Sequence, residues 1–208
     1  MTFLFLQHVF FKTHRKFLKQ YQQSATFGET LSEGRYNCVT GVALYSVLLK
    51  ELGFNFKILE TNYHIFLLVE TDDKQLVLFE TTDPVHGFTK NAKDIEARLD
   101  EYREGRVAYA EKGKEYYDFQ TKVYQEVSLN QLRGLLYYNY AVEAYNNQDF
   151  PLAIDNFAKA LDFYQSARMD EFYNILSYQL QRSSVDATVK ERFVKEVSAR
   201  VVRPRSNF

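Results

Sequence analysis

Hydrophobic positions between residues 38 and 52 recur every three or four residues. They are Cys38, Val42, Tyr45, Leu49 and Leu52. This spacing gathers them on one face of a helix. Asn37 is a suitable N-cap before the segment, and Gly53 is a suitable first residue after it. The pattern predicts a mostly buried helix from about residue 38 to residue 52, with the only cysteine of the chain in its first turn.

Three apolar runs after this helix predict strands. Residues 54–60 alternate apolar and polar side chains at first, and residues 63–70 and 75–82 are rich in Val, Leu, Ile and Phe. A two-residue turn at 72–73 would make the last two runs a hairpin in which Glu70 faces Gln75.

This register has a consequence for two polar side chains near the open end of the hairpin. By the period of two, His64 and Asp83 share a face as diagonal neighbours, with backbones roughly 7–8 Å apart. That separation permits an imidazole–carboxylate hydrogen bond across the strands. A slip of one residue would separate the two side chains.

Amphipathic patterns predict further helices at about residues 3–22, 27–31 and 91–102. The first carries His14 on its apolar face, where a buried core histidine is the simplest interpretation. Its basic residues indicate a solvated face in preference to a membrane-surface face. The tyrosine-rich segment 107–117 is open to interpretation as a cover for a cleft.

The last third of the chain predicts a separate helical unit. A helix begins near Ser128 with a capping-box pattern and reaches about Asn147, and Pro151 marks the start of a second helix. This pair resembles one tetratricopeptide repeat. Because a single repeat does not bury its own apolar face, helices at about 169–180 and 185–201 are expected to cover it. The alternative is that the pair packs against the first domain. The predicted domains are residues 1–125 and 126–208.

Cys38 has two interpretations. A thiolate is stabilised at a helix N-terminus by unpaired N–H groups and the helix dipole, and the thiolate is the nucleophilic form. The alternative is a small buried hydrophobic side chain, which is the commoner role of a lone cysteine.

The order of three polar residues points to a family. Cys38 follows Tyr-Asn at a helix start, His64 follows Asn-Tyr on a strand, and Asp83 lies in Thr-Thr-Asp-Pro after the next strand. Over residues 10–90 this order resembles the bacterial transglutaminase-like superfamily, which has the papain-like cysteine protease fold.

The resemblance implies an α+β fold, in which N-terminal helices pack on a small antiparallel sheet. It implies a Cys38, His64 and Asp83 triad that hydrolyses or transfers peptide or amide bonds through a thioester. Tyr36 and Asn37 are then candidates to line the cleft and stabilise the oxyanion. No cofactor is implied, the substrate is a peptide or protein, and the helical repeat is a possible site for a protein partner.

Other interpretations stay open at this point. The papain-like domain and the repeat can both serve docking, without catalysis, or residues 1–90 can be a scaffold for a peptide-binding helical array. His86 is a weaker candidate for the base because it lies in a loop after a proline. A zinc set of Cys38, His64, His86 and Asp83 lacks the usual short ligand spacing, so no metal site is expected.

Composition narrows the class of protein. The 208 residues are 46% hydrophobic and carry a net charge of −1, which indicates a globular chain without a basic field for nucleic acid. No apolar run is long enough to cross a membrane. The apolar start lacks the basic region and cleavage site of a signal peptide, so the sequence reads as cytoplasmic without excluding an exported form.

Overall fold

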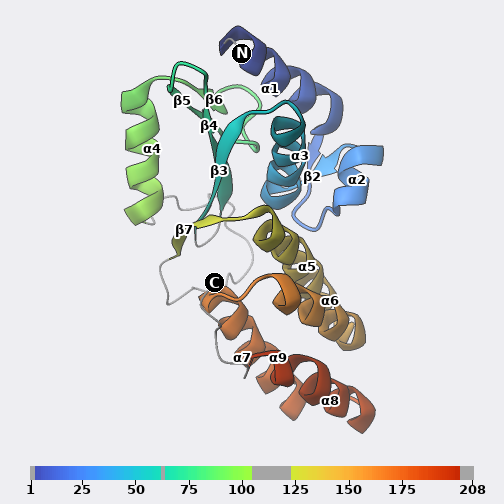
Figure 1. The fold of residues 1–208 in the computed structure, drawn as a ribbon. Helices are drawn as coiled ribbons and strands as arrows, with labels where there is room; N and C mark the ends of the chain where they lie inside the picture. The colour runs from blue at the N-terminus through green and yellow to red at the C-terminus, as the bar shows by residue number, and fades with distance from the viewer. Residues whose placement is uncertain (1–2, 62–63, 105–122, 202–208) are drawn as a thin grey trace. The chain divides into compact units, whose positions relative to one another are not determined.

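We describe the chain from a computed structural model, which covers residues 3–61, 64–104 and 123–201. The chain divides into two compact units, Met1–Leu129 and Asn130–Phe208. The segment 107–117, considered above as a cover for a cleft, lies outside the described residues. Figure 1 shows the course of the chain through both units.

Unit 1 is a mixed α/β unit. Its helices are α1 Phe3–Phe17, α2 Phe27–Ser32, α3 Cys38–Glu51 and α4 Ala92–Glu104. Its strands are β1 Gln20–Tyr21, β2 Arg35–Tyr36, β3 Asn55–Thr61, β4 Ile65–Glu70, β5 Leu76–Phe79, β6 Phe88–Thr89 and β7 Tyr124–Val127. An antiparallel five-stranded sheet has the order β6-β5-β4-β3-β7, and β1 and β2 form a separate parallel pair. The expected helices on an antiparallel sheet are therefore confirmed.

Two predicted boundaries were wrong for the same reason. The first helix ends at Phe17 and not near residue 22, because Gln20 and Tyr21 pair with Arg35 and Tyr36. The predicted domain boundary at 125/126 falls inside β7, which pairs with β3 in unit 1. Both pairings join residues far apart in sequence, so local periodicity does not indicate them.

The predicted register of the β4–β5 hairpin was wrong by one residue. Glu70 pairs with Leu76, not with Gln75. The Thr71 N–H donates to the Gln75 carbonyl at 2.9 Å, which leaves three residues in the turn. The last of them, Lys74, has a left-handed φ of 62°. Three-residue hairpin loops commonly end in this conformation, usually with glycine, so a lysine there gave no signal.

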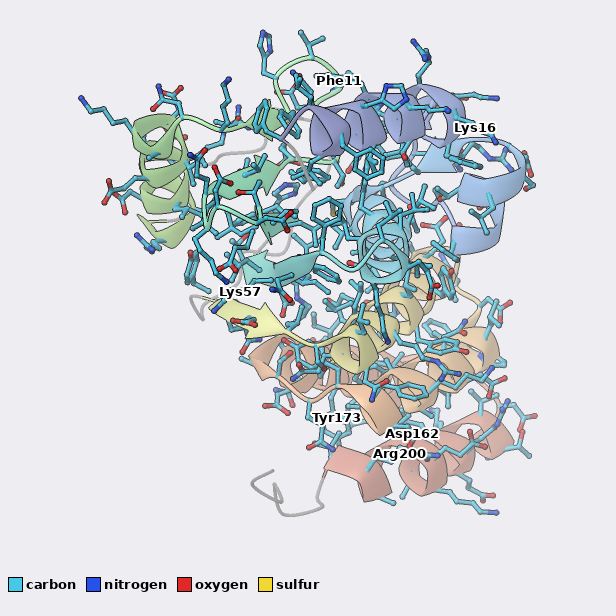
Figure 2. The ribbon with its side chains drawn as sticks, turned by 45° about the horizontal axis from the view of Figure 1, so that its top comes forward. Phe11, Lys16, Lys57, Asp162, Tyr173 and Arg200 are labelled. Carbon is cyan, nitrogen blue, oxygen red and sulfur yellow. The ribbon has the colours of Figure 1, made fainter. Side chains whose placement is uncertain are left out.

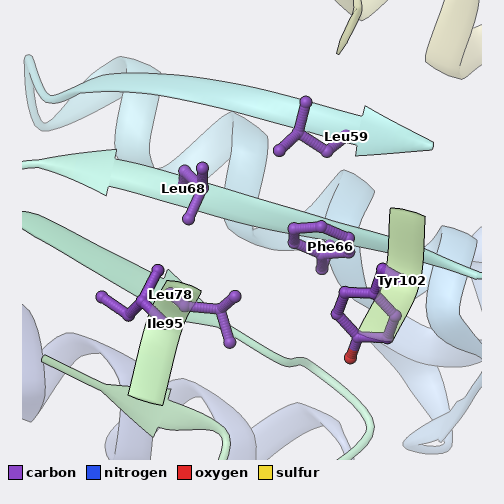
Figure 3. Close-up of a cluster of buried hydrophobic side chains, with 6 residues drawn as sticks. All are labelled: Leu59, Phe66, Leu68, Leu78, Ile95 and Tyr102. Carbon is purple, nitrogen blue, oxygen red and sulfur yellow. The ribbon is translucent and has the colours of Figure 1, made fainter. Parts of the chain in front are cut away.

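The two faces of the five-stranded sheet carry separate sets of buried side chains. On one face, α4 covers a cluster that Figure 3 shows. The cluster consists of Leu59, Phe66, Leu68, Leu78, Ile95 and Tyr102. On the other face, Phe79 contacts Phe10 of α1 and Tyr45 of α3, with ring centroids 4.9 and 5.4 Å apart. Figure 1 shows α4 on one side of the sheet, with α1 and α3 on the other.

Helix α3 begins and ends as its sequence predicts. The Asn37 side chain accepts from the Thr40 N–H, and Thr40 Oγ1 accepts from the Asn37 N–H, which completes a capping box. Gly53 follows the helix with a φ of 75°, a left-handed conformation that glycine adopts without strain. The Cys38 backbone is therefore held at the first helical position.

Unit 2 is entirely helical in its described residues. Its helices are α5 Leu129–Asn146, α6 Phe150–Phe163, α7 Ala167–Arg182, α8 Ala187–Phe193, the π-helical turn η1 Val194–Ser198 and α9 Ala199–Val201. Helix α5 begins at Leu129, the last residue of unit 1.

The later helices of unit 2 cover the first pair, as expected. Phe172 of α7 packs edge-on against Tyr138 and Phe157, with ring centroids 5.5 and 4.9 Å away. Arg200 Nε donates to the Asp162 carboxylate at 2.8 Å, which joins α9 to α6 (Figure 2). These contacts bury the apolar face that one helix pair leaves exposed.

Candidate active site

Three polar side chains meet at one end of the sheet of unit 1. His64 directly precedes β4 and Glu80 directly follows β5. Because these strands are antiparallel, the start of β4 and the end of β5 lie at the same edge. Cys38, at the N-terminus of α3, is partly exposed and lies near enough to His64 to help raise the pKa of that imidazole.

A short buried contact joins His64 to Glu80. His64 Nε2 lies 2.5 Å from Glu80 Oε2, and the two side chains are 3% and 6% exposed. The carboxylate therefore engages the Nε2 side of the imidazole.

The charges of His64 and Glu80 stabilise each other. Burial alone would lower the pKa of His64, but the Glu80 carboxylate and the hydrogen bonds to Cys38 and Glu80 raise it above its ordinary value. Burial alone would raise the pKa of Glu80, but the imidazolium and three hydrogen bonds lower it. An imidazolium–carboxylate pair is thus the favoured state near neutral pH.

Glu80 is held by more than His64. The Tyr102 hydroxyl of α4 donates to Oε2 at 2.8 Å, the same oxygen that contacts His64. The Thr82 N–H and hydroxyl donate to Oε1 at 3.2 and 2.7 Å. Tyr102 also stacks on Phe66 with ring centroids 4.7 Å apart. Both carboxylate oxygens are therefore fixed, which orients the imidazole in turn.

The structure pairs His64 with Glu80 and not, as predicted, with Asp83. The corrected register explains the exchange, since a shift of one residue turns Asp83 away and brings Glu80 onto the His64 face. Asp83 instead organises the loop after β5, because its Oδ1 accepts from the N–H groups of Val85 and His86 at 3.1 and 2.8 Å. The only sequence signal for Glu80 was a carboxylate directly after a buried apolar strand.

The side chain of Asn37 is fully used in hydrogen bonds that stabilise the local fold. Its side-chain NH₂ donates to the carbonyls of Gln23 and Ala25 at 2.9 and 3.0 Å, while its side-chain oxygen caps α3. Both amide hydrogens are therefore used, and the predicted oxyanion role does not fit this side chain. Thr40 also takes part in the cap, which leaves the N–H groups of Cys38 and Val39 without an acceptor inside the helix.

Tyr36 lies buried beside the site. Its ring packs edge-on against His14 and Tyr21, with centroids 5.7 and 5.8 Å away. Burial raises the pKa of Tyr36, and the Glu80 and Asp83 carboxylates raise it further. Its hydroxyl is therefore close enough to both carboxylates to respond to their charge, and Tyr36 stays a candidate to line the site.

The other candidate histidines have different surroundings. His14 is buried on α1 as expected, with Nε2 3.2 Å from the Thr81 carbonyl, and burial lowers its pKa. His86 has a side chain that is 79% exposed, with Nδ1 3.8 Å from Asp83. Among the described residues, no three His, Cys, Asp or Glu side chains are grouped as a metal site.

Comparison with protein-family models, curated proteins and solved structures found no match to this chain. In the part of the chain that the structure describes, no helix is both long and apolar enough for a membrane span.

Proposed function

We propose that unit 1 is a cysteine hydrolase or acyltransferase of the transglutaminase-like, papain-like type. It would act on peptide or amide bonds through a thioester on Cys38. The observation that carries the proposal is the buried His64–Glu80 pair beside Cys38, a thiol at a helix N-terminus. A nucleophile, a base and a group that orients the base are the parts that covalent acyl transfer requires.

In this mechanism Cys38 reacts as a thiolate beside the His64 imidazolium, and the sulfur attacks the carbonyl carbon of the substrate. The S–C bond forms, and the carbonyl oxygen takes up negative charge. The C–N bond then breaks as the imidazolium donates the proton to the leaving amine, which leaves a thioester. His64 next removes a proton from water or from an amine, which attacks the thioester and releases the sulfur. Release of the sulfur restores the thiolate–imidazolium pair.

Glu80 stabilises the imidazolium that each half of this cycle needs. Its two oxygens are held by Tyr102 and Thr82, so the carboxylate does not have to reorganise when the imidazole becomes charged. The Cys38 N–H has no acceptor within α3 and is suited to donate to the developing oxyanion. Tyr36 is the remaining side-chain candidate for a second donor.

Alkylation of Cys38 by iodoacetamide tests the proposed thiolate–imidazolium pair. Because the chain has one cysteine, the total label reports on this site directly. We expect the wild-type protein to keep most of its alkylation rate when the pH falls from 9 to 6. We expect His64→Ala to lose about tenfold or more at pH 6, since an ordinary thiol has a pKa of about 8.5. His86→Ala is the matched control and should behave as the wild type.

A wild-type rate that falls with pH as an ordinary thiol would contradict the proposal. It would favour the interpretation in which the unit serves docking without catalysis. Equal rates at pH 6 for the wild type and His64→Ala would have the same meaning.

A further inference from the structure

Gly41 occupies a position in α3 where another residue would suit the helix better. It lies inside a helix of fourteen residues, three positions after Cys38. A glycine inside a helix is less favourable than alanine. Gly41 is also buried, so helix formation alone does not account for its presence.

The segment that follows β5 explains why position 41 is a glycine. A Cβ at Gly41 would lie 2.8 Å from Thr81 Oγ1 and 3.1 Å from Thr81 Cβ. The first distance is shorter than a non-bonded contact of this kind allows, so a side chain here would push α3 and Thr81 apart. Thr81 is fully buried, and its carbonyl lies 3.2 Å from His14 Nε2, so α1 also limits its movement.

This contact lies directly beside the candidate active site. Residues three apart on a helix share a face, so Gly41 and Cys38 face the same way. Thr81 directly follows Glu80, which holds His64. The separation between Gly41 and Thr81 therefore sets how near the Cys38 sulfur comes to the imidazole.

We infer that Gly41 is a positioning residue for the nucleophile. It allows α3 to approach Thr81 closely enough for Cys38 to reach His64. The inference rests on the proposed function for its consequence in catalysis, but its geometric content is independent of catalysis.

A larger side chain at position 41, combined with a smaller one at position 81, tests the inference. We expect Gly41→Ala to lower the alkylation rate of Cys38 at pH 6 by about tenfold, because the thiol moves out of reach of the imidazole. Adding Thr81→Ala removes the hydroxyl that the new methyl group meets and should restore the rate to within a few fold of wild type. Adding Thr81→Ser keeps that hydroxyl and should not restore it. Gly28→Ala on α2 is the control, since its Cβ would have only one neighbour, at 3.9 Å.

The ring resonances of His64 in NMR spectra give a second measurement that needs no reactivity. They should shift in Cys38→Ala, shift similarly in Gly41→Ala, and return in Gly41→Ala with Thr81→Ala. Wild-type reactivity that does not depend on His64 would refute the proposed function, and these resonances would still test Gly41. Unchanged resonances and rate in folded Gly41→Ala, or no recovery in the double variant, would overturn the inference.

Discussion

At the residue scale, the proposed chemistry of Cys38 depends on which carboxylate orients His64. Glu80 is buried and lies 2.5 Å from the ring, whereas Asp83 accepts from backbone N–H groups in the following loop. Both are single carboxylates near the end of β5, so their amide variants form a matched pair.

Glu80→Gln should lower Cys38 alkylation at pH 6 by about tenfold and destabilise the protein by about 3 kcal/mol, because one partner of a buried ion pair is lost. Asp83→Asn should keep the alkylation rate within about twofold of wild type, since its Oδ1 can still accept from the loop. Alkylation kinetics and chemical denaturation give the two quantities. A larger loss of rate in Asp83→Asn than in Glu80→Gln would reverse the assignment.

The same pair predicts how stability depends on pH. The lowered pKa of Glu80 contributes stability above its ordinary value of 4.5, and this is lost as the pH falls toward the lowered pKa. The raised pKa of His64 contributes stability below its ordinary value of 6.5, and this is lost as the pH rises toward the raised pKa. The wild type should therefore gain most over the double variant His64→Gln, Glu80→Gln between these two values.

Unfolding free energies of the two proteins, measured from pH 3 to pH 9, check this expectation. The other titrating groups largely cancel in the difference between them. A difference that does not change over this range would show that folding does not shift the pKa values of His64 and Glu80.

At the element scale, the start of α3 fixes where Cys38 lies. Asn37 caps the helix and also binds two carbonyls of the preceding loop. Thr26 caps α2 with the same kind of capping box. Variants of the two caps therefore distinguish the effect of losing any helix cap from the effect of losing the cap next to Cys38.

We expect Asn37→Ala to cost about 2–4 kcal/mol, because it removes a cap and leaves buried carbonyls without their donor. Thr26→Ala should cost about 1 kcal/mol. Only Asn37→Ala should also slow Cys38 alkylation. Denaturation and labelling of both variants give the comparison, and equal labelling rates would mean that the cap does not position the thiol.

Elements with strong local signals could be predicted from the sequence. The α3 helix, its Asn37 cap and Gly53 follow from spacing and capping chemistry. The β4–β5 register could not, because Lys74 adopts a left-handed turn conformation that its side chain does not signal. As a result, the positions of Cys38 and His64 were foreseen, while the carboxylate was assigned to Asp83 in place of Glu80.

Short strands were also missed. The two-residue strands β1, β2 and β6 and the four-residue β7 are too short to show a period. Their partners are distant in sequence, so only the folded chain determines them. The need for glycine at position 41 also could not be predicted from local sequence, because it comes from the close approach of Thr81, forty residues away.

At the scale of the whole molecule, the site residues and the sheet belong to unit 1. Cys38, His64 and Glu80 all lie within Met1–Leu129, as does β7. Strand β7 pairs with β3, whose last residue, Thr61, hydrogen-bonds with His64. The unit therefore contains what the site requires.

A fragment of residues 1–129 should fold and label at Cys38 at the wild-type rate. A fragment that ends at residue 123 lacks β7 and should be less stable, since β3 becomes an unpaired edge strand. Thermal unfolding and alkylation compare the two fragments. Loss of labelling in the longer fragment would mean that unit 2 contributes to the site.

Acyl transfer to Cys38 can be measured by intact-mass spectrometry after addition of p-nitrophenyl acetate. We expect one acetyl group on Cys38 in the wild type, a release of p-nitrophenolate that matches it, and loss of the acetyl group to water. We also expect a much slower reaction in His64→Ala. A chain that takes up no acetyl group at Cys38, or does so equally fast without His64, would contradict the account.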